Sequence, residues 1–159
     1  RLTTDHPNWE KFVHAFEKTC EFLAKQIARD GEGATKLVEV EVTGAQTDEE
    51  ARQVAKSIVG SSLVKTAVYG SDANWGRIIA AIGYSGAQIN PDTIDLSVGP
   101  LTLVKQSAPT SYSEEEASEY LQRETIQIGV HLHYGEGTAK AWGCDLTYDY
   151  VRINASYRT

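Results

Sequence analysis

The stretch Leu37-Val38-Glu39-Val40-Glu41-Val42-Thr43 decides the architecture of this chain. Its apolar and charged residues alternate strictly, and a period of two is typical of a β-strand with one buried face. The pattern predicts that the three valines are buried and that Glu39 and Glu41 lie on the opposite face. The chain should therefore contain a sheet with one covered face.

Helices are predicted on both sides of this strand. Before it, apolar residues recur at spacings of three and four over residues 9–29, which is the period of a helix with an apolar stripe, and Asp30-Gly31 ends the pattern. After it, Thr47-Asp48-Glu49-Glu50 forms a capping box, and apolar residues continue on one face until Gly60.

The rest of the chain continues the alternation of strands and helices. The patterns predict strands over 62–69, 93–98 and 101–105, and helices over 75–83 and 113–123. Residues 126–132 and 138–147 alternate on either side of a glycine-rich turn and predict a long antiparallel hairpin. Since no repeat or linker interrupts the order, residues 1–159 are expected to form a single layered α/β domain.

Composition and charge exclude several classes of protein. The chain has 159 residues, 41% apolar and 23% charged, which fits one globular domain and excludes a disordered or collagen-like chain. Its longest apolar run, 78–82, is far below the roughly 20 residues needed to cross a bilayer. With 15 Lys and Arg against 22 Asp and Glu, the net charge of −7 argues against nucleic acid and anionic membranes as partners.

The cysteines and the first residue bear on the cellular context. Cys20 and Cys144 are too few for a disulfide framework and favour a reducing, intracellular environment. Cys20 lies in the apolar stripe of the first helix and is expected to pack there. The chain starts with Arg1 and contains no methionine, so we expect Arg1 to be an internal position of a longer protein.

No single motif in the chain specifies a reaction. Gly31-Glu32-Gly33-Ala34-Thr35-Lys36 looks like a phosphate-binding loop, but it precedes a strand, whereas such loops follow a strand and open a helix. A helix end with a tight turn explains the glycines better. Glu32 stands out, because the flanking glycines leave little bulk around its carboxylate and a ligand can approach closely.

Other chemistry-bearing residues have plain structural explanations. His131 and His133 are expected on one strand face as a conceivable metal pair, but no third ligand is evident and zinc needs at least three. Cys144 has no base beside it in the sequence and is not expected to be a nucleophile. Asp145 and Asp149 can share one face, as polar residues at a sheet edge do.

Four long stretches occur together in a fixed order and spacing. They are Asp-Gly-Glu-Gly-Ala-Thr-Lys at 30–36, Val-Lys-Thr-Ala at 64–67, Gly-Ser-Asp-Ala-Asn-Trp-Gly-Arg at 70–77, and Ala-Trp-Gly-Cys-Asp-Leu-Thr-Tyr-Asp-Tyr-Val-Arg-Ile-Asn-Ala-Ser-Tyr-Arg-Thr at 141–159. Together they closely resemble the ornithine acetyltransferase (glutamate N-acetyltransferase) family of arginine biosynthesis.

The resemblance implies a self-processing DmpA/ornithine acetyltransferase-like fold, an αββα sandwich of two stacked mixed sheets. Members cleave their precursor before a threonine in an Ala-Thr-Met-Leu context, and this threonine becomes the N-terminal nucleophile of the β chain. That motif is absent here, so the chain resembles the C-terminal part of the β chain and no catalytic residue is expected in it. The implied partners are the α chain and the upstream β-chain segment, in a heterotetramer of two α and two β chains.

The resemblance also implies a reaction and three substrate-binding residues. The acetyl group of N2-acetylornithine is expected to pass to glutamate through an acetyl-threonine intermediate, without a metal or organic cofactor, and use of acetyl-CoA is left open. Glu32, Asn154 and Thr159 match the family's substrate-binding positions. We expect Glu32 to hold a substrate ammonium group and the other two to offer hydrogen bonds. Bacterial members are cytoplasmic and fungal ones mitochondrial.

Two alternatives stay open from the sequence. A related self-processing amidohydrolase or aminopeptidase is disfavoured by the stretches around Glu32 and the C-terminus, which resemble the transferase. A non-catalytic ligand-binding or scaffold subunit is favoured by the bare sequence, because the chain holds no complete catalytic set.

Overall fold

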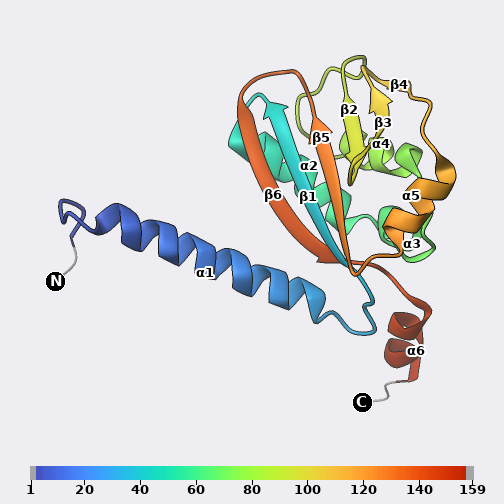
Figure 1. Cartoon of the computed structure of the whole chain (residues 1–159), viewed down its shortest axis with the longest axis horizontal. Coiled ribbons are helices and arrows are strands. Elements are labelled where there is room, and N and C mark those ends of the chain that lie inside the picture. The colour runs from blue at the N-terminus through green and yellow to red at the C-terminus, as the bar shows by residue number, and fades with distance from the viewer. Residues whose placement is uncertain (1–2, 157–159) are drawn as a thin grey trace.

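A six-stranded mixed sheet forms the centre of the computed structural model, which describes residues 3–156 (Figure 1). The elements are, in chain order, α1 (Trp9–Arg29), β1 (Leu37–Ala45), α2 (Asp48–Gly60), α3 (Ser62–Tyr69), α4 (Trp75–Gly83), β2 (Asp95–Val98), β3 (Leu101–Lys105), β4 (Ala108–Pro109), α5 (Glu114–Leu121), β5 (Thr125–His131), β6 (Gly137–Cys144) and α6 (Tyr148–Ser156). The α/β class and the mixed sheet are confirmed. Of the stacked layers that the resemblance implied, residues 3–156 contribute this one sheet and the helices on it.

Strand β1 lies inside the sheet, in the order β4-β3-β2-β5-β1-β6. It runs parallel to β5, with Val40 opposite Ile128, and antiparallel to β6, with Val40 opposite Ala141. The predicted hairpin of β5 with β6 is therefore wrong, because β1 separates them. Alternation specifies a strand but not its partner. The turn over residues 132–136 is long enough to cross the end of β1, because β5 and β6 are two strand spacings apart, or about 10 Å.

The core fills the space between one face of the sheet and the helices α2 to α5. The valines of β1 are at most 2% exposed, and the apolar face of α2 packs on them, with Ala51, Val54, Ala55 and Ile58 all at 0%. Glu39 and Glu41 lie on the other face, as predicted. The N-cap half of the predicted capping box is present, since the Thr47 hydroxyl accepts the N–H of Glu50 at 3.2 Å, but the Glu50 carboxylate accepts the N–H of Gln88 in place of that of Thr47.

The segment Ser62–Tyr69 is helix α3, so the predicted strand is wrong. The Ser61 hydroxyl accepts the N–H of Val64 at 3.4 Å and caps the helix. Val64, Ala67 and Val68 are buried at a spacing of three and four, which is a helical period. The β-branched residues of this short apolar run favoured a strand locally, and burial against the core decided otherwise.

Helix α1 extends away from the sheet, and none of its residues is buried among residues 3–156 (Figure 1). The predicted helix over 9–29 is confirmed, but its apolar stripe is exposed, with Phe12 at 48% and Phe16 at 59%. Cys20 is exposed as well, so the expectation that it packs in the stripe is wrong for the described residues. Periodicity predicts the stripe, but it does not show what covers it.

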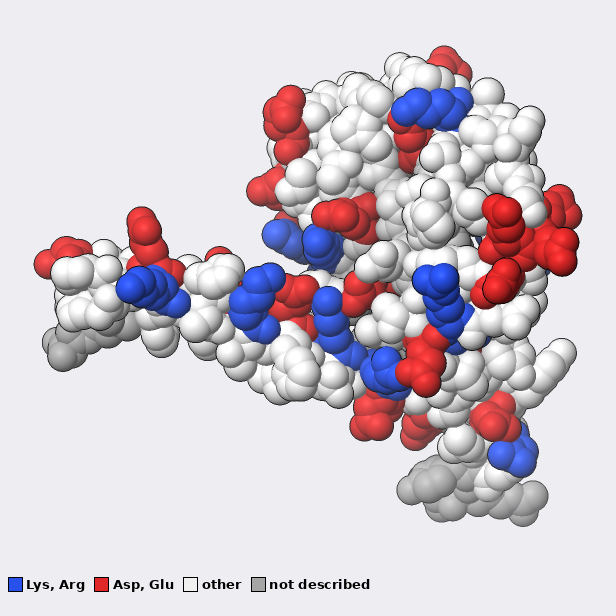
Figure 2. Space-filling view, in the orientation of Figure 1, with Lys and Arg blue, Asp and Glu red and all other residues white. Residues whose placement is uncertain are grey.

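Charged side chains are distributed unevenly over the molecule. On the face that Figure 2 shows, acidic and basic side chains are interspersed along α1, and acidic side chains gather over α5, whose first turn holds Glu114, Glu115 and Glu116. Carboxylates in the first turn interact favourably with the helix dipole. Within residues 3–156, no helix is both long and apolar enough to span a membrane.

Ile58 offers a test of this core. Its side chain is 0% exposed, so Ile58→Ala should lower the free energy of unfolding by about 2 to 5 kcal/mol in urea denaturation. Leu63, on the neighbouring helix, is 57% exposed, and Leu63→Ala should change it by less than about 0.5 kcal/mol. Equal effects of the two substitutions would contradict the packing described here.

Candidate functional site

The loop before β1 and the segment after β6 meet at one corner of the sheet. Leu37, the first residue of β1, pairs with Cys144, the last residue of β6. Because the two strands are antiparallel, the residues before Leu37 and those after Cys144 leave the sheet side by side. Helix α6 follows there and lies beside the turn that precedes β1 (Figure 1).

This corner brings together two of the three predicted site residues. Asn154, on α6, donates from Nδ2 to Glu32 Oε2 at 2.9 Å, although 122 positions separate them. The same Nδ2 lies 2.9 Å from the carbonyl oxygen of Tyr150. Both Glu32 and Asn154 are exposed, so this pair forms an open surface. Thr159, the third predicted residue, lies outside the described residues.

The glycines beside Glu32 are required by the approach of the C-terminal segment. A Cβ on Gly31 would lie 2.7 Å from the sulfur of Cys144, and one on Gly33 would lie 2.7 Å from the backbone nitrogen of Tyr150. Gly33 also has a φ of 67°, in the left-handed region that favours glycine. The space that the sequence suggested for a ligand is therefore partly filled by this chain itself.

Asp145 holds the loop onto the C-terminal segment. It is only 3% exposed, and its carboxylate accepts hydrogen bonds from the N–H groups of Thr35 (2.8 Å) and Lys36 (3.0 Å) and from the Thr35 hydroxyl (2.5 Å). The expectation of ordinary sheet-edge polarity is wrong, because Asp145 is buried and Asp149 belongs to helix α6. Sequence reasoning missed this role of Asp145, since its partners lie about 110 positions away.

Lys36 is a second residue that sequence reasoning missed. Its Nζ donates to the carbonyl oxygens of Val68 (2.7 Å) and Tyr69 (3.3 Å) and to the hydroxyl of Ser71 (3.1 Å). Burial lowers the pKa of Lys36, and the nearby Asp145 carboxylate opposes that shift. An ammonium group at the end of α3 also complements the negative end of the helix dipole, so Lys36 fastens the loop to the core.

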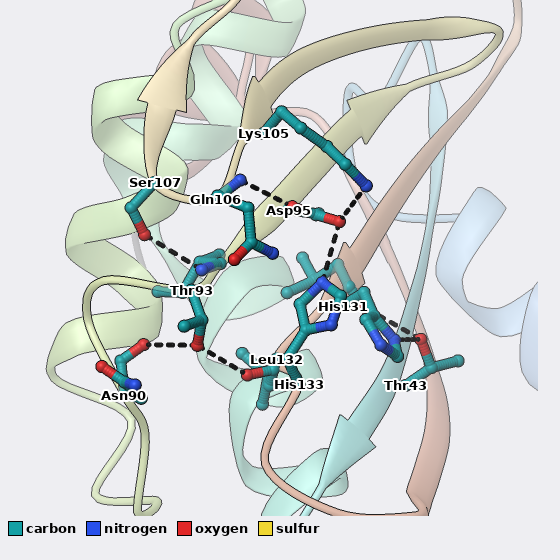
Figure 3. Close-up of polar contacts among 12 residues, drawn as sticks. Thr43, Asn90, Thr93, Asp95, Lys105, Gln106, Ser107, His131, Leu132 and His133 are labelled. Carbon is teal, nitrogen blue, oxygen red and sulfur yellow. Dashed lines mark hydrogen bonds and ion pairs between the residues drawn. The ribbon is translucent and has the colours of Figure 1, made fainter.

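A separate polar cluster surrounds Asp95 and the two histidines (Figure 3). Asp95 Oδ2 lies 2.5 Å from Lys105 Nζ and 2.9 Å from His133 Nε2, and its Oδ1 accepts the N–H of Gln106 at 2.7 Å. The imidazole of His131 packs edge to face on that of His133, with ring centroids 4.0 Å apart.

The two imidazoles lie side by side next to Asp95, as expected of a shared face, but only His131 belongs to a strand. His131 ends β5 and its Nδ1 lies 2.8 Å from the Thr43 hydroxyl, whereas His133 follows the strand in a left-handed conformation and faces Asp95. Among residues 3–156 no three His, Cys, Asp or Glu side chains are grouped so as to hold a metal ion.

The contacts of Asp95 affect stability at low pH. Partial burial raises the pKa of this carboxyl, but the Gln106 N–H, the Lys105 ammonium and His133 outweigh that effect and hold the pKa well below 3.8. A carboxylate with a depressed pKa in the folded state stabilises the protein above its unfolded pKa and loses this contribution as the pH falls.

Asp95→Asn should accordingly lower the free energy of unfolding by roughly 1 to 3 kcal/mol at pH 7, because charge-assisted hydrogen bonds are lost. The difference from the unsubstituted protein should shrink as the pH falls below 3.8. Urea unfolding at a series of pH values measures this, with the exposed Asp92→Asn as control. A difference that does not depend on pH would show that the charge of Asp95 is not responsible.

Comparison with known proteins identifies the family. The ArgJ family model matches residues 2–159. The chain belongs to the ArgJ family. It is 68% identical over 158 residues to the arginine biosynthesis bifunctional protein ArgJ of Geobacillus stearothermophilus and 67% identical over 159 residues to that of Halalkalibacterium halodurans. The resemblance found in the sequence is therefore confirmed.

Coverage and structure agree with this assignment. The alignments cover 99% of this chain but only 38% and 39% of these relatives, so the chain spans about two fifths of their length. A crystal structure of the arginine biosynthesis bifunctional protein ArgJ from Bacillus halodurans superposes with a TM-score of 0.96 at 66% identity. The superposition covers 98% of this chain and 74% of that one, so the ArgJ family fold is shared over nearly all of it.

Proposed function

We propose that this chain forms the amino-acid recognition part of a glutamate N-acetyltransferase, which moves the acetyl group of N2-acetylornithine to glutamate. The contact between Asn154 and Glu32 carries the proposal, because it joins two residues that match the family's substrate-binding positions. The relatives' name, arginine biosynthesis bifunctional protein ArgJ, agrees with acetyl transfer in that pathway.

The chemistry of the pair suits an amino-acid substrate. Asn154 binds Oε2 of Glu32, which leaves Oε1 for an ammonium group of the substrate. A carboxylate on an exposed surface becomes a stronger partner for a cation once other protein groups close over it and exclude water. The Asn154 amide and the Thr159 hydroxyl offer hydrogen bonds to the polar end of the same molecule.

The reacting groups are proposed to lie outside this chain. A threonine hydroxyl at the N-terminus of the β chain attacks the acetyl carbonyl of N2-acetylornithine, the amide bond breaks, and ornithine leaves with the transferred proton. The amino group of glutamate then attacks the acetyl ester, forms a new amide bond and releases the threonine. Residues near that threonine would stabilise the oxyanion formed in each step, which is worth about 3 to 4 kcal/mol per donor in other enzymes.

The α chain and the upstream β-chain segment are proposed as partners, in a heterotetramer of two α and two β chains. They would supply the remaining walls of the site that Glu32 and Asn154 leave open. Since the relatives come from bacteria such as Geobacillus and Halalkalibacterium, a cytoplasmic location is proposed.

Glu32→Gln in the full-length protein tests the recognition role. Loss of the charge should raise the KM for N2-acetylornithine about tenfold or more, because hydrogen bonds to charged groups contribute about 1.5 to 3 kcal/mol. Transfer of acetyl to glutamate, assayed without acetyl-CoA, measures this. Glu136→Gln, an exposed glutamate next to the other end of β6, is the matched control and should behave like the unsubstituted protein. An unchanged KM and turnover in Glu32→Gln would refute the role.

The proposed intermediate can be trapped. Incubation of the full-length protein with N2-acetylornithine, in the absence of glutamate, should add one acetyl group to a threonine that lies outside residues 1–159. Mass spectrometry of proteolytic peptides locates the modification, and added glutamate should remove it. Acetate release without an acyl-enzyme, or an acetyl group on a residue of this chain, would favour another mechanism.

A further inference from the structure

A closed ring of hydrogen bonds joins Glu32 to Asn154 through Thr147. The Thr147 hydroxyl donates to the carbonyl oxygen of Gly33 at 2.7 Å and accepts the N–H of Tyr150 at 3.1 Å. Asn154 Nδ2 then lies 2.9 Å from both the Tyr150 carbonyl oxygen and Glu32 Oε2. Because Gly33 follows Glu32 in the chain, the contacts return to their starting point. We call these five residues the Thr147 ring.

Thr147 determines where helix α6 begins. It directly precedes the helix, and its hydroxyl accepts an N–H of the first turn in the manner of an N-cap. Asn154 follows seven positions later, about two helical turns along the axis, so its position depends on where the helix starts. Helix α6 has nine residues and none of them is buried, so its cap contributes an unusually large share of its stability.

The same hydroxyl fixes the loop that carries Glu32. Gly33 lies so close to the first turn of α6 that a Cβ would come within 3.0 Å of Asp149 and 2.7 Å of the nitrogen of Tyr150. Thr147 is 4% exposed and Asp145, which binds the backbone of Thr35 and Lys36, is 3% exposed. Buried polar groups of this kind are costly to leave unpaired, so the loop and the helix move together.

We propose that Thr147 is a positioning residue of the acetyl-transfer site, supported by Asp145 behind the loop. Its hydroxyl sets the separation of Glu32 and Asn154 and thereby the affinity for the amino-acid substrate, while its own burial keeps it away from the substrate. This inference rests on the proposed function, because Glu32 and Asn154 are the proposed substrate contacts.

Kinetics of the full-length protein test the proposal. Thr147→Val keeps the shape of the side chain but removes both hydrogen bonds, and it should raise the KM for N2-acetylornithine about tenfold while kcat changes less than about threefold. Thr147→Ser keeps the hydroxyl and should restore the KM to within about twofold of the unsubstituted protein. Thr138→Val, at an exposed threonine of β6, is the control and should leave both constants unchanged.

A double-mutant cycle separates positioning from simple stabilisation. If Thr147 acts through Glu32, Thr147→Val should raise the KM less than about twofold when Glu32→Gln is already present. If the two substitutions raise the KM additively, the proposal is overturned. It is also overturned if Thr147→Val leaves the KM unchanged and lowers kcat only in proportion to the fraction of folded protein.

If Thr147→Val does not fold, Asp145→Asn is the variant that tests the proposal. This nearly isosteric change weakens the hydrogen bonds that the side chain accepts from the N–H groups of Thr35 and Lys36. It should raise the KM for N2-acetylornithine about threefold. An unchanged KM would overturn the proposal. A normal KM in Glu32→Gln refutes the proposed function, whereas a raised KM in Glu32→Gln with a normal one in Thr147→Val refutes the positioning role alone.

Discussion

The antiparallel register of β1 with β6 is the constraint on which the site depends. It places Leu37 opposite Cys144, so that two segments far apart in the sequence leave the sheet at one corner. Strand β1 is hydrogen-bonded on its other side to β5, and its valines face the core. A shift by one residue would expose these valines and break both ladders. The meeting of Glu32 with Asn154 is therefore fixed by the same packing that stabilises the domain.

Different forces specify the sheet and its corner. Apolar burial against the helices α2 to α5 holds the sheet. At the corner the buried groups are polar. Asp145 and Thr147 form hydrogen bonds with backbone and hydroxyl groups of the loop, and these take the place of hydrogen bonds to water. A buried carboxylate is tolerated only when such partners are present. Because hydrogen bonds depend on direction, the corner holds its side chains in a narrower range of positions than apolar packing alone would allow.

Local patterns predicted the elements better than their arrangement. The alternation of β1, the Thr47 cap of α2 and the helical period over 9–29 act within a few residues, and the structure confirms all three. The pairing of β6 and the helical state of α3 depend on distant contacts, and both were predicted wrongly. Glu32 and Asn154 came from the family resemblance, since no local pattern links residues 122 positions apart. The role of Asp145 was not predicted for the same reason.

Helix α1 projects away from the sheet over most of its length (Figure 1). It meets the sheet near its C-terminal end, where Lys25 bridges Glu21 and Glu39 at 3.0 and 2.9 Å. Its 21 residues reach about 30 Å, so a tilt of about 10° at this base would carry the far end through roughly 5 Å. Any protein surface that packs against the aromatic side chains of Phe12 and Phe16 must therefore help to set the angle between α1 and the sheet.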